Sequence, residues 1–243
     1  MLVSLIIVNY NYSRYLSSCI DSCLSQEFPE NSYDVIIIDD GSTDGSQNVL
    51  LDHYSDNPRI KFYLRPNSGV ESASNFGISK STSDFILRVD SDDLLSPSYL
   101  KTIFSSDYLS YDMIYSDYYV INEKTETLER IFLPSFSPSE IKSRGDFLAT
   151  ATLLRRSLVL SLGLYDTSIK NCGLENYDLI LRLLGHDCRG LHIPSPLFSY
   201  RRHSSNLSVT RRDSIIEYGR ELAKLYSNEP YRTNQYHPYG LSF

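Results

Sequence analysis

Three aspartates stand within four residues of the chain, at Asp90, Asp92 and Asp93. Carboxylates this close repel one another when all are ionised, so at least one of their pKa values should be raised. A divalent hard cation such as Mn²⁺ or Mg²⁺ relieves the repulsion, because it prefers oxygen ligands and accepts carboxylates together with substrate phosphates. A solvated acidic turn before a helix at Pro97 would explain the same residues. The cluster alone supports both interpretations.

A second acidic pair, Asp39 and Asp40, directly follows an apolar run. A glycine at positive φ and an aspartate N-cap would account for the turn at 41–44. They would not account for two consecutive aspartates after a buried strand. A carboxylate in that place can accept the imino hydrogen of uracil or a ribose hydroxyl. The segments around Asn67 and Asn75 also allow two interpretations, turn residues or amides that line a nucleotide pocket.

The elements that must position these residues alternate along the first part of the chain. Apolar runs predict strands at 3–8, 35–38, 60–64 and 85–89, and helical spacing predicts helices at 13–25, from about 44, and at 71–80. This alternation is typical of parallel strands covered on both faces. Ligands bind beyond the carboxyl ends of such strands. The polar residues after the first, second and fourth strands should therefore share one rim.

The second half of the chain has a less regular pattern. It predicts a hairpin at 113–121 and 127–132, a loop at 134–138, strands at 149–154 and 192–199, and helices at 156–162, 175–184 and 214–226. The strand at 192–199 holds two prolines and is expected at a sheet edge. We predict one domain at 1–227, with a nucleotide-binding half at 1–95, an acceptor-binding half at 96–227 and a tail at 228–243.

Composition narrows the class of protein. A net charge of −7 argues against binding of a nucleic-acid backbone. The cysteines, Cys19, Cys23, Cys172 and Cys188, match no compact zinc pattern and are expected to be reduced and structural, which suits the cytosol. The apolar run before Asn9 is too short for a signal peptide or a membrane span. We expect a cytoplasmic protein, with peripheral contact at the inner membrane face left open.

In their order and spacing, the motifs resemble the family 2 glycosyltransferases, inverting enzymes of the GT-A fold. Each motif is weak alone, but the ordered set is specific, and the resemblance runs from residue 3 to about residue 205. The matching segments are 3–11, 38–44, 67–69, 75–77 and 89–93. The resemblance implies an α/β fold, with a GT-A-like (Rossmann-like), mostly parallel sheet flanked by helices and a small antiparallel hairpin.

The resemblance also implies roles for the matching positions. Asp39 and the Asn9-Tyr10 turn would hold the base, Asp90 would lie near the ribose, and Asp92 would ligate the Mn²⁺ or Mg²⁺ that bridges the diphosphate. His203, in a Tyr-Arg-x-His stretch, would lie close to the metal and phosphates. The full set of predicted nucleotide-sugar-binding residues is Val8, Asn9, Tyr10, Asp39, Asn67, Asp90 and Ser91, with Asp92 and His203 at the metal.

The chain departs from the family pattern at two positions. Family members usually carry a Glu-Asp pair that supplies the catalytic base, whereas this chain has Glu175 followed by Asn176, and a carboxamide is not a general base. Glu175 and Asp178 are the candidate bases. Glu175 is preferred because Asp178 is also spaced for a helical ion pair with Arg182. Ser74 stands where many members carry an arginine.

The predicted function is inverting transfer of a sugar from a nucleoside diphosphate, a UDP-sugar on the strength of Asp39, to a hydroxyl group. The acceptor would be a glycan, a lipid-linked molecule or a protein in surface polysaccharide or glycoconjugate synthesis. Asn176 leaves open a nucleotide-sugar-binding protein without transferase activity. A nucleotidyltransferase would need a more basic loop than the one with Arg14. An aspartyl phosphatase would need other residues at Asp93 and Leu94.

Overall fold

The computed structural model of the chain describes residues 1–144, 148 and 150–226. Within these residues the strands form one sheet in the order β3-β2-β1-β4-β8-β6-β9-β5, and β7 pairs with β6. The strands are β1 (Val3–Asn9), β2 (Tyr33–Asp39), β3 (Ile60–Leu64), β4 (Phe85–Asp90), β5 (Leu94–Leu95), β6 (Met113–Ile121), β7 (Thr127–Ile131), β8 (Leu153–Arg155) and β9 (Gly190–Arg201).

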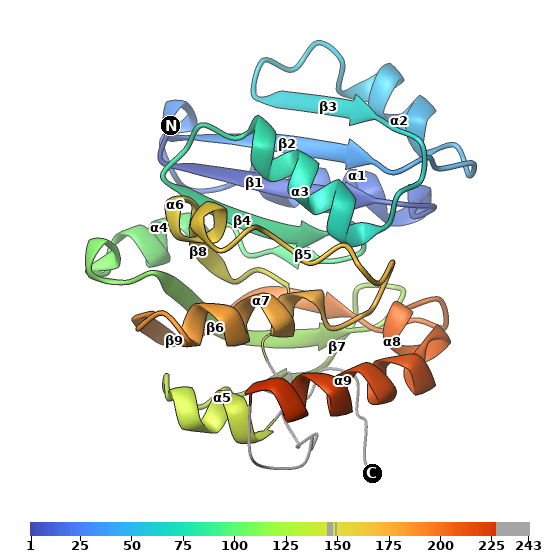
Figure 1. The fold of residues 1–243 in the computed structure, drawn as a ribbon. Helices are drawn as coiled ribbons and strands as arrows, with labels where there is room; N and C mark the ends of the chain where they lie inside the picture. Colours follow the sequence, from blue (N-terminus) through green and yellow to red (C-terminus); the bar gives the residue numbers. More distant parts are fainter. Residues whose placement is uncertain (145–147, 149, 227–243) are drawn as a thin grey trace.

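The first four strands are parallel, as their alternation with helices predicts. Asn9 at the end of β1 lies opposite Asp39 at the end of β2, and Val8 lies opposite Asp90 at the end of β4. Their arrowheads point the same way in Figure 1. The polar residues that follow these strands therefore meet at one edge of the sheet, which confirms the expected rim.

Helices cover both faces of this sheet. In Figure 1, α3 (Val70–Lys80) crosses in front of β1 and β2, and α1 (Ser13–Leu24) lies behind them. The other helices are α2 (Ser46–His53), α4 (Tyr99–Phe104), α5 (Pro138–Arg144), α6 (Arg156–Ser161), α7 (Glu175–Leu184), α8 (Leu207–Thr210) and α9 (Arg212–Tyr226), with short 3-10 turns at Glu30–Ser32 and Tyr108–Ser110. Asp44 accepts hydrogen bonds from the backbone N–H groups of Ser13 and Ser46, which begin α1 and α2.

The second half of the sheet is mixed, and two expectations for it can be compared with the structure. The segment 192–199 runs parallel to β6 and pairs with β5 only at Phe198 and Ser199, so its proline-containing part lies at the sheet edge as expected within the described residues. Its prolines are accommodated where the β6–β9 register shifts at Asp117, since proline cannot donate to the ladder. The predicted loop at 134–138 ends where Pro138 begins α5.

The remaining predictions for this half hold in part. The hairpin forms from β6 and β7, and the pairing is antiparallel. Of the strand predicted at 149–154, β8 forms only at Leu153–Arg155, and residue 149 lies outside the described residues. The tail predicted at 228–243 also lies outside them. The division into halves at residue 95 stays a prediction, and a single sheet crosses it.

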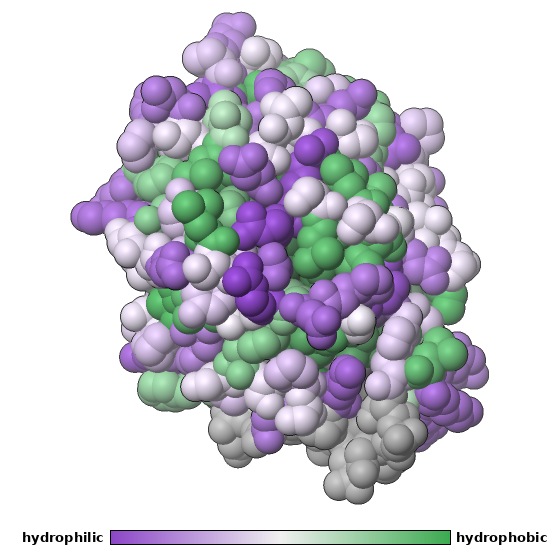
Figure 2. All heavy atoms as spheres, turned by 60° about the vertical axis from the view of Figure 1, so that its left-hand side comes forward, coloured by the Kyte–Doolittle hydropathy of each residue, from purple (hydrophilic) through white to green (hydrophobic). Residues whose placement is uncertain are grey.

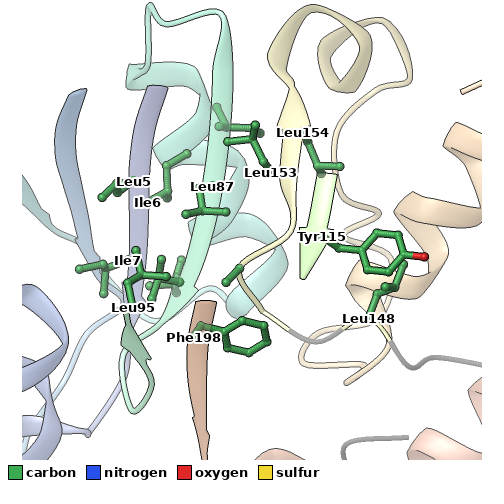
Figure 3. Close-up of a cluster of buried hydrophobic side chains, with 14 of the residues drawn as sticks. Leu5, Ile6, Ile7, Leu87, Leu95, Tyr115, Leu148, Leu153, Leu154 and Phe198 are labelled. Atoms are coloured by element: carbon green, nitrogen blue, oxygen red, sulfur yellow. The ribbon is translucent and has the colours of Figure 1, made fainter. Parts of the chain in front are cut away.

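One apolar core runs through both halves of the sheet. Figure 3 shows Leu5, Ile7 and Leu87 of β1 and β4 on one side and Leu153 and Leu154 of β8 on the other. All four cysteines are free and buried, as predicted. Figure 2 shows hydrophilic and hydrophobic side chains interspersed over the face it presents. No helix within the described residues is both long and apolar enough to cross a membrane.

Candidate active site

A cavity of about 460 Å³ opens at the carboxyl ends of β1 and β4. Its size is in the range of small-molecule sites, which span roughly 300–1,000 Å³. The predicted site residues that line it are Val8, Tyr10, Asn67, Asp90, Ser91, Asp92 and Glu175. The predicted donor-binding residues and Glu175, the preferred candidate base, therefore line the same cavity.

The acidic loop that follows β4 is fixed by Arg201 at the end of β9. The Arg201 side chain is buried, and its Nε donates to the backbone oxygen of Asp92 at 2.7 Å. The Arg201 backbone N–H donates to Asp93 Oδ1, also at 2.7 Å. The loop is thus held in place by a segment more than a hundred residues away in the sequence, since these partners are 108 and 109 positions apart.

Asp92 presents one oxygen to the protein and keeps the other open. His203 Nε2 lies 2.9 Å from Asp92 Oδ2, and Asn206 Nδ2 donates to the same oxygen at 3.2 Å. His203 Nδ1 accepts the N–H of Ser205, which assigns the ring proton to Nε2 and makes His203 a donor to Asp92. No described residue hydrogen-bonds to Asp92 Oδ1.

The electrostatics of the loop agree with the expectation of mutual repulsion. Burial, opposed by Arg88 and reinforced by Asp92 and Glu175, raises the pKa of Asp90 to about 6. Burial and the charges of Asp92 and Asp90 raise the pKa of Asp93 well above its usual range. Crowded carboxylates beside an open carboxylate oxygen form the kind of donor set that suits a hard divalent cation. The residues present therefore fit Mn²⁺ or Mg²⁺.

Arg88 links the two sides of the cavity, although sequence analysis did not single it out. Its Nη1 lies 2.7 Å from Glu175 Oε1, and its Nη2 lies 3.1 Å from Asp90 Oδ1. Glu175 Oε2 and Arg88 Nε are buried and have no hydrogen-bond partner within the described part of the chain. The signal in the sequence was a charged residue inside the apolar run at 85–89.

The loop that leads into α7 is held by Glu71, which sequence analysis also missed. The Glu71 carboxylate, in the first turn of α3, accepts the N–H of Cys172 at 2.7 Å and that of Asn171 at 2.9 Å. Gly173 has φ +75°, and a Cβ there would lie 2.6 Å from the Ile215 side chain. Only glycine meets both conditions without strain, and the turn delivers Glu175 to the cavity wall.

Two predicted base-contacting residues lie behind the cavity wall. Asp39 is fully buried and accepts hydrogen bonds from Asn9 Nδ2 at 2.9 Å and the Ser42 N–H at 3.0 Å. Neither Asn9 nor Asp39 is among the lining residues, whereas Asp40 is. The Asp40 carboxylate accepts the N–H of Gly69 at 2.8 Å. Contact between Asp39 and the base stays a prediction, and Asp40 is the aspartate of this pair on the wall.

The other two candidate base positions on α7 face away from the large cavity. Asp178 forms the expected ion pair with Arg182, with Oδ2 and Nη2 2.8 Å apart, and burial raises the Asp178 pKa. Asn176 accepts a hydrogen bond from Tyr165 and lines a separate inner cavity of about 20 Å³. Of these three side chains of α7, only Glu175 lines the large cavity.

This sheet, rim and acidic loop define the chain as a glycosyltransferase-like protein of the GT-A fold. The sequence model for "Glycosyl transferase family 2" matches residues 4–159, and the chain belongs to this family. It is 31% identical over 209 residues to EpsE of Bacillus subtilis, covering 83% of this chain and 73% of EpsE. It is 30% identical over 216 residues to chondroitin synthase of Escherichia coli, covering 87% of this chain.

The chain spans only part of the length of several relatives and of the similar solved structures. It covers 30% of the Escherichia coli chondroitin synthase. S. aureus TarS 1-349 in complex with UDP-GlcNAc superposes with a TM-score of 0.75 at 17% identity, over 94% of this chain and 68% of TarS 1-349. A mannosyltransferase from Pyrobaculum calidifontis in complex with GDP-Man and Mn²⁺ gives 0.64 at 15% identity, over 86% and 59%. At these identities the likeness confirms the fold.

Proposed function

We propose that this chain transfers a sugar from a UDP-sugar to a hydroxyl acceptor with inversion. The observation that carries the proposal is the single cavity in which Asp90 and Asp92 line one side and Glu175 another. In this proposal residues 1–95 supply the donor side, and the following half supplies Glu175 and the acceptor side. The UDP-GlcNAc bound by TarS supports a uridine donor, and the chondroitin synthase relative supports a glycan acceptor in polysaccharide or glycoconjugate synthesis.

Asp92 is the residue that would hold Mn²⁺ or Mg²⁺. Its Oδ1 has no protein partner among the described residues, and its Oδ2 is oriented by His203 and Asn206. The proton on Nε2 makes His203 an orienting donor in the arrangement seen here, and ligation by His203 would require that proton to leave. When bound, the cation would neutralise the charge that develops on the departing diphosphate.

Glu175 is the residue that would take the proton of the acceptor. In the transfer, the acceptor oxygen forms a bond to the anomeric carbon while the bond from that carbon to the diphosphate oxygen breaks, and UDP departs. Attack from the face opposite UDP inverts the configuration, and the acceptor proton passes to the carboxylate. Oε1 is bound by Arg88, and Oε2 is buried without a partner within the described residues, so Oε2 is the oxygen that the acceptor would have to reach to pass on its proton.

Calorimetry and a turnover assay together test the proposal. We expect UDP to bind in the presence of Mn²⁺ and to bind much more weakly after EDTA treatment, and we expect UDP release from UDP-GlcNAc or another UDP-sugar of a panel. Absence of UDP binding with Mn²⁺ would overturn the proposal. Tight UDP binding without turnover of any donor, with acceptors present, would instead identify a nucleotide-sugar-binding protein.

A further inference from the structure

Arg88 lies between the two functional sides of the cavity and contacts both. It pairs with Glu175 and with Asp90 through different nitrogens of one guanidinium, at 2.7 Å and 3.1 Å. The Arg88 side chain is 9% exposed and that of Glu175 is 8% exposed, so solvent screens their interaction little. A planar guanidinium can hold two carboxylates in a fixed mutual geometry, whereas an ammonium group is a single point charge.

The Arg88 side chain also borders the smaller inner cavity. Arg88 lines both the large cavity and the inner one, and Ser74 and Asn176 line the inner one with it. The Ser74 hydroxyl and Arg88 Nε are buried without hydrogen-bond partners in the described residues. Tyr165 closes this region, since its ring lies 5.6 Å from the Arg88 guanidinium and its hydroxyl donates to Asn176.

Ser74 and Asn176 are also the two positions at which the sequence departs from the family pattern. One departure removes an arginine and the other removes an aspartate, and both fall on the same small cavity. Together they remove one positive and one negative charge, which leaves the balance of charge around the cavity unchanged. Among the described residues that line either cavity, Arg88 is then the arginine that pairs with a carboxylate on the donor side, Asp90, and with one on the acceptor side, Glu175.

We propose that Arg88 is a positioning residue for the transfer reaction, which holds the Glu175 carboxylate in a fixed relation to the donor-side Asp90. This inference rests on the proposed function. Holding Oε1 leaves Oε2 as the oxygen that accepts the proton. A displacement of about 1 Å in a reacting group can lower a rate by about a hundredfold. Loss of the guanidinium fork, by which Arg88 contacts both carboxylates, should therefore lower mainly kcat.

The test compares two substitutions at Arg88 with a matched arginine elsewhere. R88K keeps the charge without the fork, and R88M removes the charge. Arg155 is the control, because it forms a similar ion pair with Asp112 at 2.9 Å and lines neither cavity. For each variant we would measure the melting temperature, together with kcat and KM for UDP release from UDP-GlcNAc with Mn²⁺.

We expect R88K to remain folded with kcat lowered by about a hundredfold and a smaller change in KM, because geometry rather than charge is lost. R155M should lose stability with kcat unchanged. The double variant S74R/R88M should recover at least part of the lost kcat, because it returns a guanidinium to the same inner cavity. If R88M does not fold, R88K and the double variant decide the question.

The outcomes separate this inference from the proposed function. If the wild-type chain neither binds UDP nor releases it from any UDP-sugar, the proposed function fails. If the wild type is active and either folded Arg88 variant keeps its kcat, or both Arg88 variants fail to fold, the positioning role is wrong. A loss of kcat in R155M equal to that in R88K would also overturn the role, because the effect would then be general.

Discussion

The acidic loop at 90–93 and the first turn of α7 border the same cavity with carboxylates held in different ways. On the loop, Asp90 and Asp92 line the cavity while Asp93 is buried and does not, and the pKa values of Asp90 and Asp93 are raised. On α7, Glu175 lines the cavity and Asp178 does not, and each is paired with an arginine, although Arg88, the partner of Glu175, also pairs with Asp90 of the loop. The loop therefore has negative charge left for a cation, whereas on α7 the charge is already matched by the protein.

This difference separates the two kinds of chemistry that the proposed reaction needs. A cation site requires carboxylate oxygens without protein partners, and Asp92 Oδ1 meets that condition among the described residues. A general base requires a single carboxylate in a fixed orientation, and Glu175, bound through Oε1 only, meets it. Substitutions on each side should consequently affect different measurable steps.

The largest effect is expected for D92A. Removing the proposed ligand should abolish Mn²⁺-dependent UDP release, with a loss of about 10³-fold, in the range seen when one electrostatic stabiliser of a transition state is removed. The measurement is UDP release with Mn²⁺ and with EDTA, and D56A at an exposed aspartate serves as the control. Activity that persists in EDTA for the wild type would refute the metal assignment.

The next effect distinguishes the two carboxylates of α7. E175Q should lower kcat by about 10²–10⁴-fold while UDP binding is kept, because proton transfer to a positioned base contributes that much. D178N removes the partner of Arg182 outside the cavity and should lower the melting temperature with kcat retained. The reverse result, with kcat lost in D178N and kept in E175Q, would move the base to Asp178.

The sequence predicted the side of the cavity formed by the ends of β1, β2 and β4 better than the side formed by the second half of the chain. The strand–helix alternation placed the ends of β1, β2 and β4 at one rim because periodicity is a local signal. The alternation alone does not distinguish Asp39 from Asp40, and it was the resemblance that favoured Asp39, whose contact with the base stays a prediction. Neighbouring side chains at a strand end point to opposite sides, and β2 is buried on both faces and gives no alternating pattern.

The contacts that complete the site were beyond a local pattern. Arg88 pairs with Glu175 across 87 positions, and Arg201 reaches Asp92 across 109. Neither spacing leaves a periodic trace, because the pairing depends on how the second half of the sheet folds back on the first. A charged residue in an apolar strand, such as Arg88, is the local sign that such a partner exists, since buried charges are paired.

A smaller effect concerns pH and again separates the loop from α7. The pKa of Asp90 is raised to about 6 and that of Asp93 is raised well above its usual range, both above the value of about 3.9 expected in the unfolded chain. Protonation therefore favours the folded state, so the contribution of these groups to the unfolding free energy is fully present below the unfolded pKa of about 3.9 and is lost as pH rises through their folded pKa values, which for Asp90 means about 6.

Mn²⁺ binding should show the opposite trend, because a cation needs the ionised carboxylates and so binds more weakly at low pH. Calorimetric titration with Mn²⁺ at several pH values, beside melting curves of the metal-free protein, measures both trends. D93N should flatten the pH dependence of stability. A metal-free protein whose melting temperature is equally pH-dependent with and without Asp93 would show that other groups cause the trend.

The smallest change in rate is expected for N176D, which restores the aspartate of the family pattern. Asn176 lines the inner cavity and not the large one, so the new carboxylate should change kcat by less than about threefold, well below the contribution of a positioned base. Stability should fall instead, because Arg88 already pairs with two carboxylates, so the new half-buried carboxylate would keep the hydrogen bond from Tyr165 but gain no counter-ion. S74R/N176D should regain the lost melting temperature by adding a guanidinium to the same cavity. A rise in kcat of more than about tenfold in N176D would instead place the base at position 176 and leave Glu175 as its neighbour.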